Sequence, residues 1–310
     1  MKILFISSGG QDGKPKAVVR NQGHSLEKLG VEVIYFCVNG GGLFNYLKSV
    51  PALRRTIREI KPDVVHAHYS YSGLLAYLSG ARHLIVSFMG SELRSSWLSR
   101  IISIIVARYL CTIVIVKSEE MKRILKVKNV EVIPNGVDLE IFKEQDKYEC
   151  YSKTKLDPAK KNILFVGDPR RREKNYNLAL KTFENLDNEK FKLIQVNNLS
   201  KEELCLYYNA ADLLLMTSLW EGSPNTVKEA MACNMPVVST KAGDVDLLLN
   251  NVKKSFVCSF DPSEIAEKIK LVTKDKERSN GREKIIKMGL DSETVALRIL
   301  KLYKILSDLS

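Results

Sequence analysis

The chain has 310 residues, of which 45% are hydrophobic and 27% are charged. This composition excludes a disordered or fibrous protein, and the length favours two domains over a single core. The net charge of +12 is compatible with phosphate-bearing substrates, nucleic acid or an anionic membrane, so charge alone does not choose a function.

Two further features bear on the compartment. The longest apolar run, residues 101–116, is interrupted by polar side chains and falls short of the ~20 apolar residues of a membrane span. The six cysteines are dispersed, with no two within four residues of each other, which indicates neither a zinc site nor a disulfide framework. We therefore expect a cytoplasmic protein.

Short apolar runs alternate with helical patterns in the first half of the chain. The pattern predicts strands at 2–7, 31–38, 63–67, 84–88, 112–117 and 130–133, and helices at 16–29, 46–60 (or from Pro51) and 97–110. Strands that alternate with helices indicate βαβ units and a parallel sheet.

Residues 143–161 are rich in charge and are predicted to form an exposed linker. After them the alternation restarts, with strands expected at 162–166, 191–196, 212–216, 236–239 and 255–258 and a terminal helix at 295–309. We therefore predict an α/β protein with two doubly wound, Rossmann-like domains that face each other across a cleft. Domain one is residues 1–145 and domain two is residues 146–310, whose last helix is a candidate to pack back on the first. Ligands of such sheets bind at the carboxyl ends of the strands.

The segment 218–233 follows a predicted strand and carries the most chemical information. Gly222 permits a tight turn, Ser223 is a suitable N-cap and Pro224 suits the first helical position. The first amide groups of the helix, at Asn225 and Thr226, would then bind an anion such as phosphate. Two carboxylates nearby, Glu221 and Glu229, are suited to accept hydrogen bonds from sugar or ribose hydroxyls.

A second segment, 165–175, places a glycine and four cations after another strand: Gly167, Arg170, Arg171, Arg172 and Lys174. Arg and Lys make strong contacts with diphosphates. A solvated basic turn is the alternative, but the position at a strand end favours a phosphate site.

Together these residues resemble the retaining glycosyltransferases of family four, which have the GT-B fold. The resemblance covers nearly the whole chain. It includes two glutamates separated by seven residues (Glu221 and Glu229), the phosphate-loop positions Gly167 and Lys174, and the weaker segments 63–68 and 132–138. It implies that Lys174 and an arginine, Arg171 or Arg172, stabilise the departing phosphate. Glu221 would hold the donor sugar and Glu229 the ribose.

The sequence departs from the family at two places. Asp168 stands where the family usually has Arg, and one of the three following arginines is expected to supply that charge. Met89 stands where the family commonly has a His that contacts the donor sugar, although Gly90 and Glu92 remain as candidate pocket residues.

The first domain is expected to serve the acceptor. His66 and His68 lie on one face of a strand, and an acceptor-side role is weighed equally against a structural one as half-buried histidines. Gly10 lies in a glycine-rich loop, residues 9–15, which in the family approaches the donor phosphate or the acceptor. The basic segments 46–60 and 94–102, the latter with Trp97, are suited to contact with an anionic membrane, although a solvated basic face over a core stripe is the favoured interpretation.

We therefore expect transfer of a sugar from a nucleotide-sugar, UDP- or GDP-linked, to a hydroxyl of a glycan or lipid-linked acceptor, with retained anomeric configuration. Bacterial surface polysaccharide or glycolipid synthesis is the expected setting, with the protein in the cytoplasm or peripheral to the inner face of the membrane. No cofactor, nucleic acid or metal is expected, since the single Asp244-Val245-Asp246 is a weak metal signal. The alternatives are a GT-B sugar-nucleotide epimerase or phosphorylase, and a non-catalytic glycosyltransferase-like subunit.

Overall fold

The computed structural model of the chain describes residues 1–10, 13–94, 96–154 and 156–308. Positions 11–12 of the glycine-rich loop, 95 of the basic segment and 155 of the charged stretch lie outside the described residues. The chain divides into two compact units, one formed by 1–136 with 292–310 and the other by 137–291.

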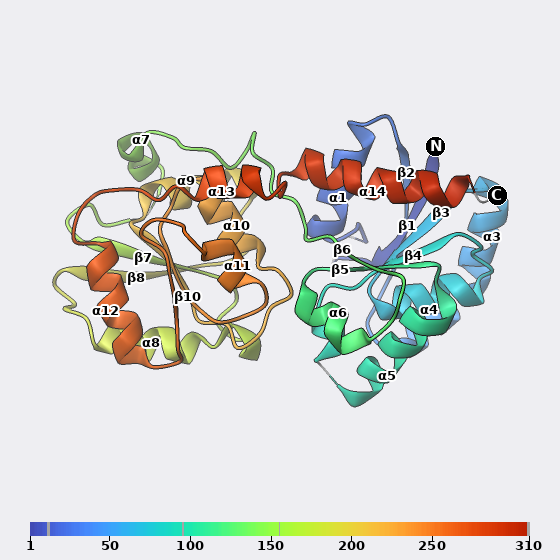
Figure 1. Ribbon diagram of the computed structural model, residues 1–310, viewed down its shortest axis with the longest axis horizontal. Helices are drawn as coiled ribbons and strands as arrows, with labels where there is room; N and C mark the ends of the chain where they lie inside the picture. The colour runs from blue at the N-terminus through green and yellow to red at the C-terminus, as the bar shows by residue number, and fades with distance from the viewer. Residues whose placement is uncertain (11–12, 95, 155, 309–310) are drawn as a thin grey trace. The chain divides into compact units, whose positions relative to one another are not determined.

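The first unit contains a six-stranded parallel sheet in the order β2-β1-β3-β4-β5-β6 (Figure 1). Its strands are β1 (Lys2–Ser8), β2 (Glu32–Val38), β3 (Val64–His68), β4 (Leu84–Ser87), β5 (Ile113–Val116) and β6 (Val130–Val132). Its helices are α1 (Ala17–Glu27), α2 (Leu43–Lys48), α3 (Val50–Ile60), α4 (Ser70–Leu78), α5 (Trp97–Ile105), α6 (Glu119–Leu125) and α14 (Ser292–Ser307).

Alternate side chains of each strand supply two hydrophobic cores, one on each face of this sheet. Ile3 and Phe5 of β1 pack with α1 and α14, whereas Leu4 and Ile6 pack on the opposite face. The terminal helix α14 follows the second unit in the chain and packs on the first, because Val295, Ile299, Tyr303 and Leu306 form one buried apolar stripe.

The second unit contains a five-stranded parallel sheet in the order β11-β10-β9-β7-β8. Its strands are β7 (Lys161–Val166), β8 (Phe191–Val196), β9 (Leu213–Met216), β10 (Val237–Thr240) and β11 (Phe256–Cys258). Its helices are α7 (Lys147–Ser152), α8 (Tyr176–Glu184), α9 (Lys201–Ala210), α10 (Asn225–Ala232), α11 (Val245–Leu249), α12 (Pro262–Val272) and α13 (Gly281–Lys287). α8 and α12 contribute to the core on one face, and α7, α9, α10 and α13 to the core on the other.

Three regions differ from the sequence predictions. The predicted helix 46–60 is two helices, α2 and α3, with Pro51 in the first turn of α3. The predicted helix 97–110 becomes a π-helical turn after Ile105. The charged stretch 143–161 is no exposed linker, because Cys150 and Leu156 are buried in the core of the second unit.

The sequence analysis placed the domain boundary after residue 145. In the structure the units divide after Gly136, because Val137 pairs with Asp291 and Phe142 is buried in the second core. The chain returns to the first unit at Ser292, where α14 begins.

Candidate active site

The candidate site of the second unit lies where the strand order changes direction. β7 is the first strand of the sheet, with β8 on one side and β9 on the other. The loops that follow β7 and β9 therefore leave the sheet in opposite directions, which opens a crevice at the carboxyl ends of the strands. Both chemistry-bearing segments of the sequence, 167–174 and 218–226, follow these two strands.

Lys174 and Glu221 meet at this edge although 47 residues separate them. Lys174 Nζ lies 2.7 Å from Glu221 Oε1, and the same oxygen accepts a hydrogen bond from Ser218 Oγ at 2.9 Å. The two charged side chains are only 13% and 18% exposed. A partly buried ion pair of this kind holds the ammonium group in a fixed position.

Gly167 lies next to the Lys174 side chain at the end of β7. Its φ of +148° lies in the region that favours glycine, and a Cβ added there would lie 3.5 Å from the methylene groups of Lys174. The Lys174 stem thus lies over the glycine at the end of β7. The fold thus brings together three residues that the sequence analysis placed in one site, namely Gly167, Lys174 and Glu221.

Backbone contacts join the two loops. The amide of Leu219 donates to Glu173 O at 2.8 Å, and Thr217 Oγ1 donates to Lys174 O at 3.0 Å. Thr240 Oγ1 extends the connection to the next strand by donating to Ser218 O at 2.8 Å. The Lys174–Glu221 geometry therefore rests on three neighbouring strand ends.

The three arginines differ in their partners. Arg170 is paired with Asp168 at 2.8 Å and its side chain is 84% exposed. Arg171 is paired with Glu173 at 2.5 Å. Arg172 is exposed and makes no ion pair within the described part of the chain, so its charge is the least neutralised of the three.

The helix α10 begins one residue later than the sequence suggested. Pro224 is the N-cap residue, and the helix starts at Asn225. Ser223 is buried and provides no side-chain cap, which corrects its expected role. The amide groups of Asn225 and Thr226 remain at the first turn, where the helix dipole favours an anion.

Glu229 lies one turn into α10 and faces other polar groups. Its Oε2 accepts a hydrogen bond from the buried Tyr208 hydroxyl at 3.1 Å. Burial raises the pKa of Glu229, against the opposing effects of Tyr208, Lys228, Lys201 and Lys174. The carboxylate therefore lies within the electrostatic reach of the Lys174 ammonium.

Two charged residues of this region, Lys228 and Asp244, were not expected to be buried. Lys228 is fully buried, and burial lowers its pKa to about 8 despite the nearby carboxylates Asp244 and Glu229. Asp244 lies in the loop after β10, where burial raises its pKa. Adjacent Gly243, at φ +62°, approaches so closely that a Cβ would lie 2.6 Å from Gly222 O. A lone Lys beside Glu229 in the sequence gave only a weak signal of this cluster.

The two carboxylates of the Asp-Val-Asp segment have different surroundings. Asp244 lies near Lys228, whereas exposed Asp246 is paired with Lys241 at 2.8 Å. Within the described ranges, no three His, Cys, Asp or Glu side chains gather in a way that would hold a metal ion.

In the first unit, the strand ends carry a tight polar turn. The Glu92 carboxylate is 5% exposed and accepts hydrogen bonds from the amides of Met89 and Gly90 at 2.8 and 2.9 Å. Burial raises its pKa. Gly90 adopts a φ of +112°, which favours glycine. Gly10 donates its amide to Lys14 O at 2.7 Å within the loop after β1.

His66 and His68 share one face of β3, as the alternation predicted, and stack with ring centroids 4.5 Å apart. Both are fully buried rather than half-buried. His66 contacts Tyr303 Oη at 2.6 Å and Ser87 Oγ at 2.8 Å, and burial lowers the pKa of both rings, that of His68 to about 3. An acceptor-side role for these rings stays a prediction. Neither imidazole is exposed to solvent in this structure.

A parallel sheet with a glycine, a lysine and a helix start at its switch point is typical of α/β proteins that bind phosphate. Comparison with known families is more specific. Residues 31–141 match the model described as Glycosyltransferase Family 4, and residues 163–275 match Glycosyl transferases group 1. The two matches together span more than two thirds of the chain, which therefore belongs to the group 1 glycosyltransferases of family four.

Individual relatives are distant. An Escherichia coli UDP-Gal:alpha-D-GlcNAc-diphosphoundecaprenol alpha-1,3-galactosyltransferase is 23% identical, over 71% of this chain and 68% of that protein. An uncharacterized glycosyltransferase of Methanocaldococcus jannaschii is 25% identical, over 66% of this chain and 62% of that protein. The match thus spans less than two thirds of the archaeal relative.

Solved structures agree with the fold. Sucrose-phosphate synthase from Thermosynechococcus elongatus has a TM-score of 0.85 at 18% identity, with complete coverage of both chains. Anabaena HepE, in complex with UDP and glucose, has a TM-score of 0.79 at 17% identity, over 97% of this chain and 98% of that one. The two doubly wound sheets are those of the GT-B fold, as predicted. Among the described residues, no helix combines the length and apolar character that spanning a membrane requires.

Proposed function

We propose that this glycosyltransferase moves a sugar from a UDP- or GDP-linked donor to a hydroxyl group and retains the anomeric configuration. The observation that carries the proposal is the Lys174–Glu221 pair at the switch point of the second sheet, beside the start of α10. The family resemblance supports retention, and the UDP bound by HepE supports a nucleotide-sugar donor.

The main task of the site is to stabilise the departing diphosphate. Negative charge grows on that group as the glycosidic bond breaks, and a preorganised cation is then most effective. Lys174 supplies this cation. Arg172 is the arginine best placed to assist, because Asp168 and Glu173 already neutralise Arg170 and Arg171.

The carboxylates orient the donor. Glu221 accepts hydrogen bonds from the donor sugar, and Glu229 accepts them from the nucleotide ribose. The first amides of α10, at Asn225 and Thr226, face the phosphate. The acceptor hydroxyl passes its proton to the leaving phosphate, so this step needs no side-chain base.

We further propose that transfer needs no bound metal. Lys174 and the positive end of α10 supply the positive charge that a divalent ion would otherwise bring to a diphosphate. The separate partners of Asp244 and Asp246 support this assignment.

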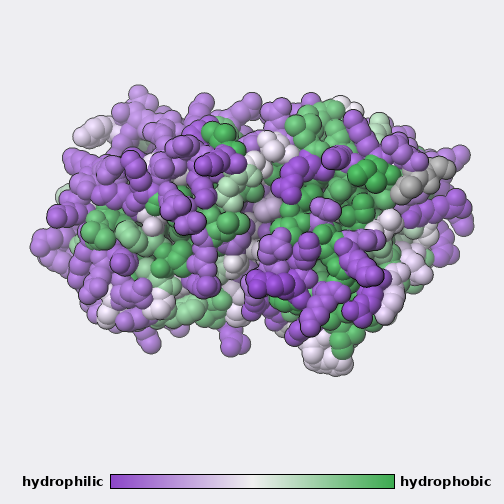
Figure 2. Space-filling model, in the orientation of Figure 1, coloured by the Kyte–Doolittle hydropathy of each residue, from purple (hydrophilic) through white to green (hydrophobic). Residues whose placement is uncertain are grey.

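A lipid-linked or glycan acceptor is the proposed partner, with surface polysaccharide or glycolipid synthesis as the setting. The E. coli relative's name specifies a diphosphoundecaprenol acceptor. On α5, Trp97 is 75% exposed and Ile101 43% exposed. Hydrophobic surface is visible where Figure 1 places α5, next to hydrophilic side chains (Figure 2). An aromatic and aliphatic face with nearby arginines is suited to the surface of an anionic bilayer.

Two experiments test these proposals. UDP, GDP, ADP and their sugars are screened by thermal shift, and a ligand at a hundred times its Kd should add ~2.7 kcal/mol to stability. No shift with any of them would contradict the donor assignment.

For the membrane, sedimentation with anionic vesicles should exceed that with neutral ones and should fall with salt. Equal binding to both would contradict the membrane proposal and leave the transferase proposal standing.

A further inference from the structure

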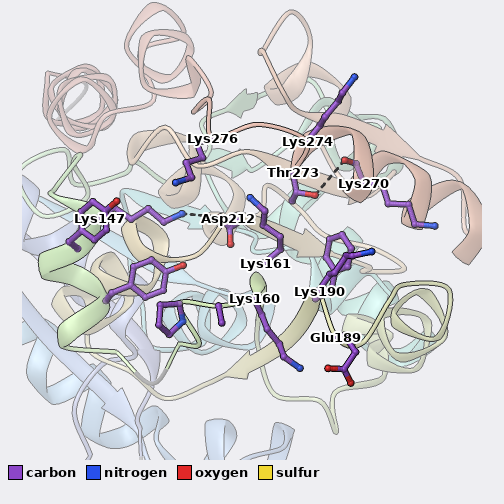
Figure 3. A pocket seen from close by; sticks show the side chains of 15 residues that line it. Lys147, Lys160, Lys161, Glu189, Lys190, Asp212, Lys270, Thr273, Lys274 and Lys276 are labelled. Carbon is purple, nitrogen blue, oxygen red and sulfur yellow. Dashed lines mark hydrogen bonds and ion pairs between the residues drawn. The ribbon is translucent and has the colours of Figure 1, made fainter.

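A second cationic region lies at the opposite end of the second sheet. A cavity of about 730 Å³ opens beside the first residues of β7 and β8, Lys161 and Phe191 (Figure 3). β7 has six residues, so it separates this cavity from the candidate active site by roughly 20 Å along the strand. The cavity is therefore distinct from the proposed donor site.

Seven lysines line the cavity against only two carboxylates, Glu189 and Asp212. The lysines come from four separate segments, namely α7, the residues around the start of β7, the turn before β8, and the end of α12 with the residues after it: Lys147, Lys160, Lys161, Lys190, Lys270, Lys274 and Lys276. Like charges gathered around one cavity repel each other, and an anion bound among them would relieve that repulsion.

Carboxylates neutralise only part of this charge: Lys190 Nζ is paired with Asp187 at 2.9 Å. Asp212 accepts from Lys147 Nζ at 2.9 Å and from the Asn162 amide at 2.7 Å. Lys161 and Lys276 make no ion pair within the described ranges, and their ammonium ends point toward the same centre as Lys147 (Figure 3). Three ammonium groups therefore line the cavity, and only that of Lys147 is paired with Asp212.

Helix electrostatics explain only part of the cluster. Cations near the carboxyl end of α12 interact favourably with its dipole, which accounts for Lys270 and Lys274. That effect does not account for Lys147, Lys160, Lys161 or Lys190, which belong to other elements. The wall beside Lys147 is aromatic, since Tyr148 and Tyr151 also line the cavity and Lys147 Nζ lies 5.4 Å from the Tyr151 ring centroid.

We propose that this cavity is a second anion-binding site, which takes a small soluble molecule with two or more phosphate groups. The lysines contact the phosphates, and the two tyrosines contact a ring or other apolar part of the ligand. The concave shape and the volume suit a small molecule better than a flat membrane surface.

The probe for this site is inorganic pyrophosphate, added to the full chain carrying Lys174→Ala. That background removes the ammonium group expected to hold a diphosphate at the candidate active site. Two further substitutions, Lys161→Gln with Lys276→Gln, remove charge from the cavity. Lys181→Gln with Lys253→Gln removes the same charge from exposed positions of the second unit outside it.

Pyrophosphate should raise the Tm of the background chain and of the control equally, and calorimetry should show affinity about tenfold or more weaker in the cavity variant. Lys270→Gln with Lys274→Gln serves as a second cavity variant if the first fails to fold. The same Tm shift and affinity in all chains would overturn the proposal. Vesicle binding that depends on Lys161 and Lys276, without pyrophosphate binding, would also overturn it in favour of a lipid surface.

Discussion

The polar residues at the strand ends of the two sheets are arranged in contrasting ways. In the second unit, Lys174 and Glu221 keep 13% and 18% of their side chains exposed and form an ion pair at the sheet edge. In the first unit, His66, His68 and Lys117 are 2% exposed or less. Groups that are to contact a charged substrate need access to it, so we expect the chemistry of the leaving group at the second sheet.

Buried polar groups in the first unit hold its own structure. His66 bridges Ser87 of β4 and Tyr303 of α14, and Lys117 Nζ donates to Ile133 O at 3.2 Å. Through Tyr303, the end of β3 is connected to a helix from the far end of the sequence. The first unit is thus expected to influence activity by shape and stability rather than by charge.

The largest effect should come from Lys174→Ala. Removing one preorganised charge-stabilising group lowers kcat by on the order of 10²–10³, while the donor KM should change less. Steady-state kinetics measure the effect, and circular dichroism checks the fold. A correctly folded variant with nearly full kcat would show that the basic loop is only a solvated turn and does not stabilise the leaving phosphate.

Glu229→Gln should weaken donor binding next. Hydrogen bonds to a charged group contribute about 1.5–3 kcal/mol, so we expect about a 10- to 100-fold loss of donor affinity. The Tyr208 contact can persist with the amide, which keeps α10 in place. Calorimetry with the donor nucleotide measures the change, and unaltered affinity would remove Glu229 from the site.

The buried His68 of the first unit should make the stability of the protein depend on pH. The pKa of His68 is lowered to about 3, so between pH 6.5 and that value the unfolded chain binds the additional proton. His68 therefore does not lower the free energy of unfolding above pH 6.5. Below that pH its protonation in the unfolded chain lowers this free energy by up to ~1.4 kcal/mol per pH unit. His68→Phe should flatten the fall in Tm between pH 6.5 and 4, and an unchanged slope would contradict the burial of a neutral ring.

Arg170→Ala should have the smallest effect. Its guanidinium is highly exposed and paired with Asp168, so kcat should fall by less than about twofold. Arg172→Ala, measured beside it, should lower kcat by more. A larger loss of kcat with Arg170→Ala than with Arg172→Ala would indicate that Arg170 supplies the charge that the family usually has at the position of Asp168.

The sequence predicted most strands to within one or two residues, because buried parallel strands are continuous apolar runs between breakers. The sequence also indicated which positions gather at the carboxyl ends of β7 and β9, since glycine, cations and a helix start followed strand ends. The contact between Lys174 and Glu221 itself depends on the order of β7 and β9, which local pattern does not specify.

Burial was the harder quantity to predict. Residues 143–161 are highly charged, yet Cys150 and Leu156 fix that stretch to the core. His66 and His68 were expected to be half-buried, and only the packing of α14 through Tyr303 shows that they are enclosed. Lys228 is likewise fully buried, and Asp244 of the loop after β10 opposes the effect of burial on its pKa.

The most direct test of the central claim is the anomeric configuration of the transferred sugar. The full chain is incubated with the nucleotide-sugar that gives the largest thermal shift, with candidate hydroxyl acceptors and with a metal chelator. Proton NMR of the product then reports the new linkage. We expect release of nucleoside diphosphate and a linkage of the same configuration as the donor. An inverted linkage, or turnover that stops with the chelator and recovers with a divalent ion, would contradict the proposed mechanism.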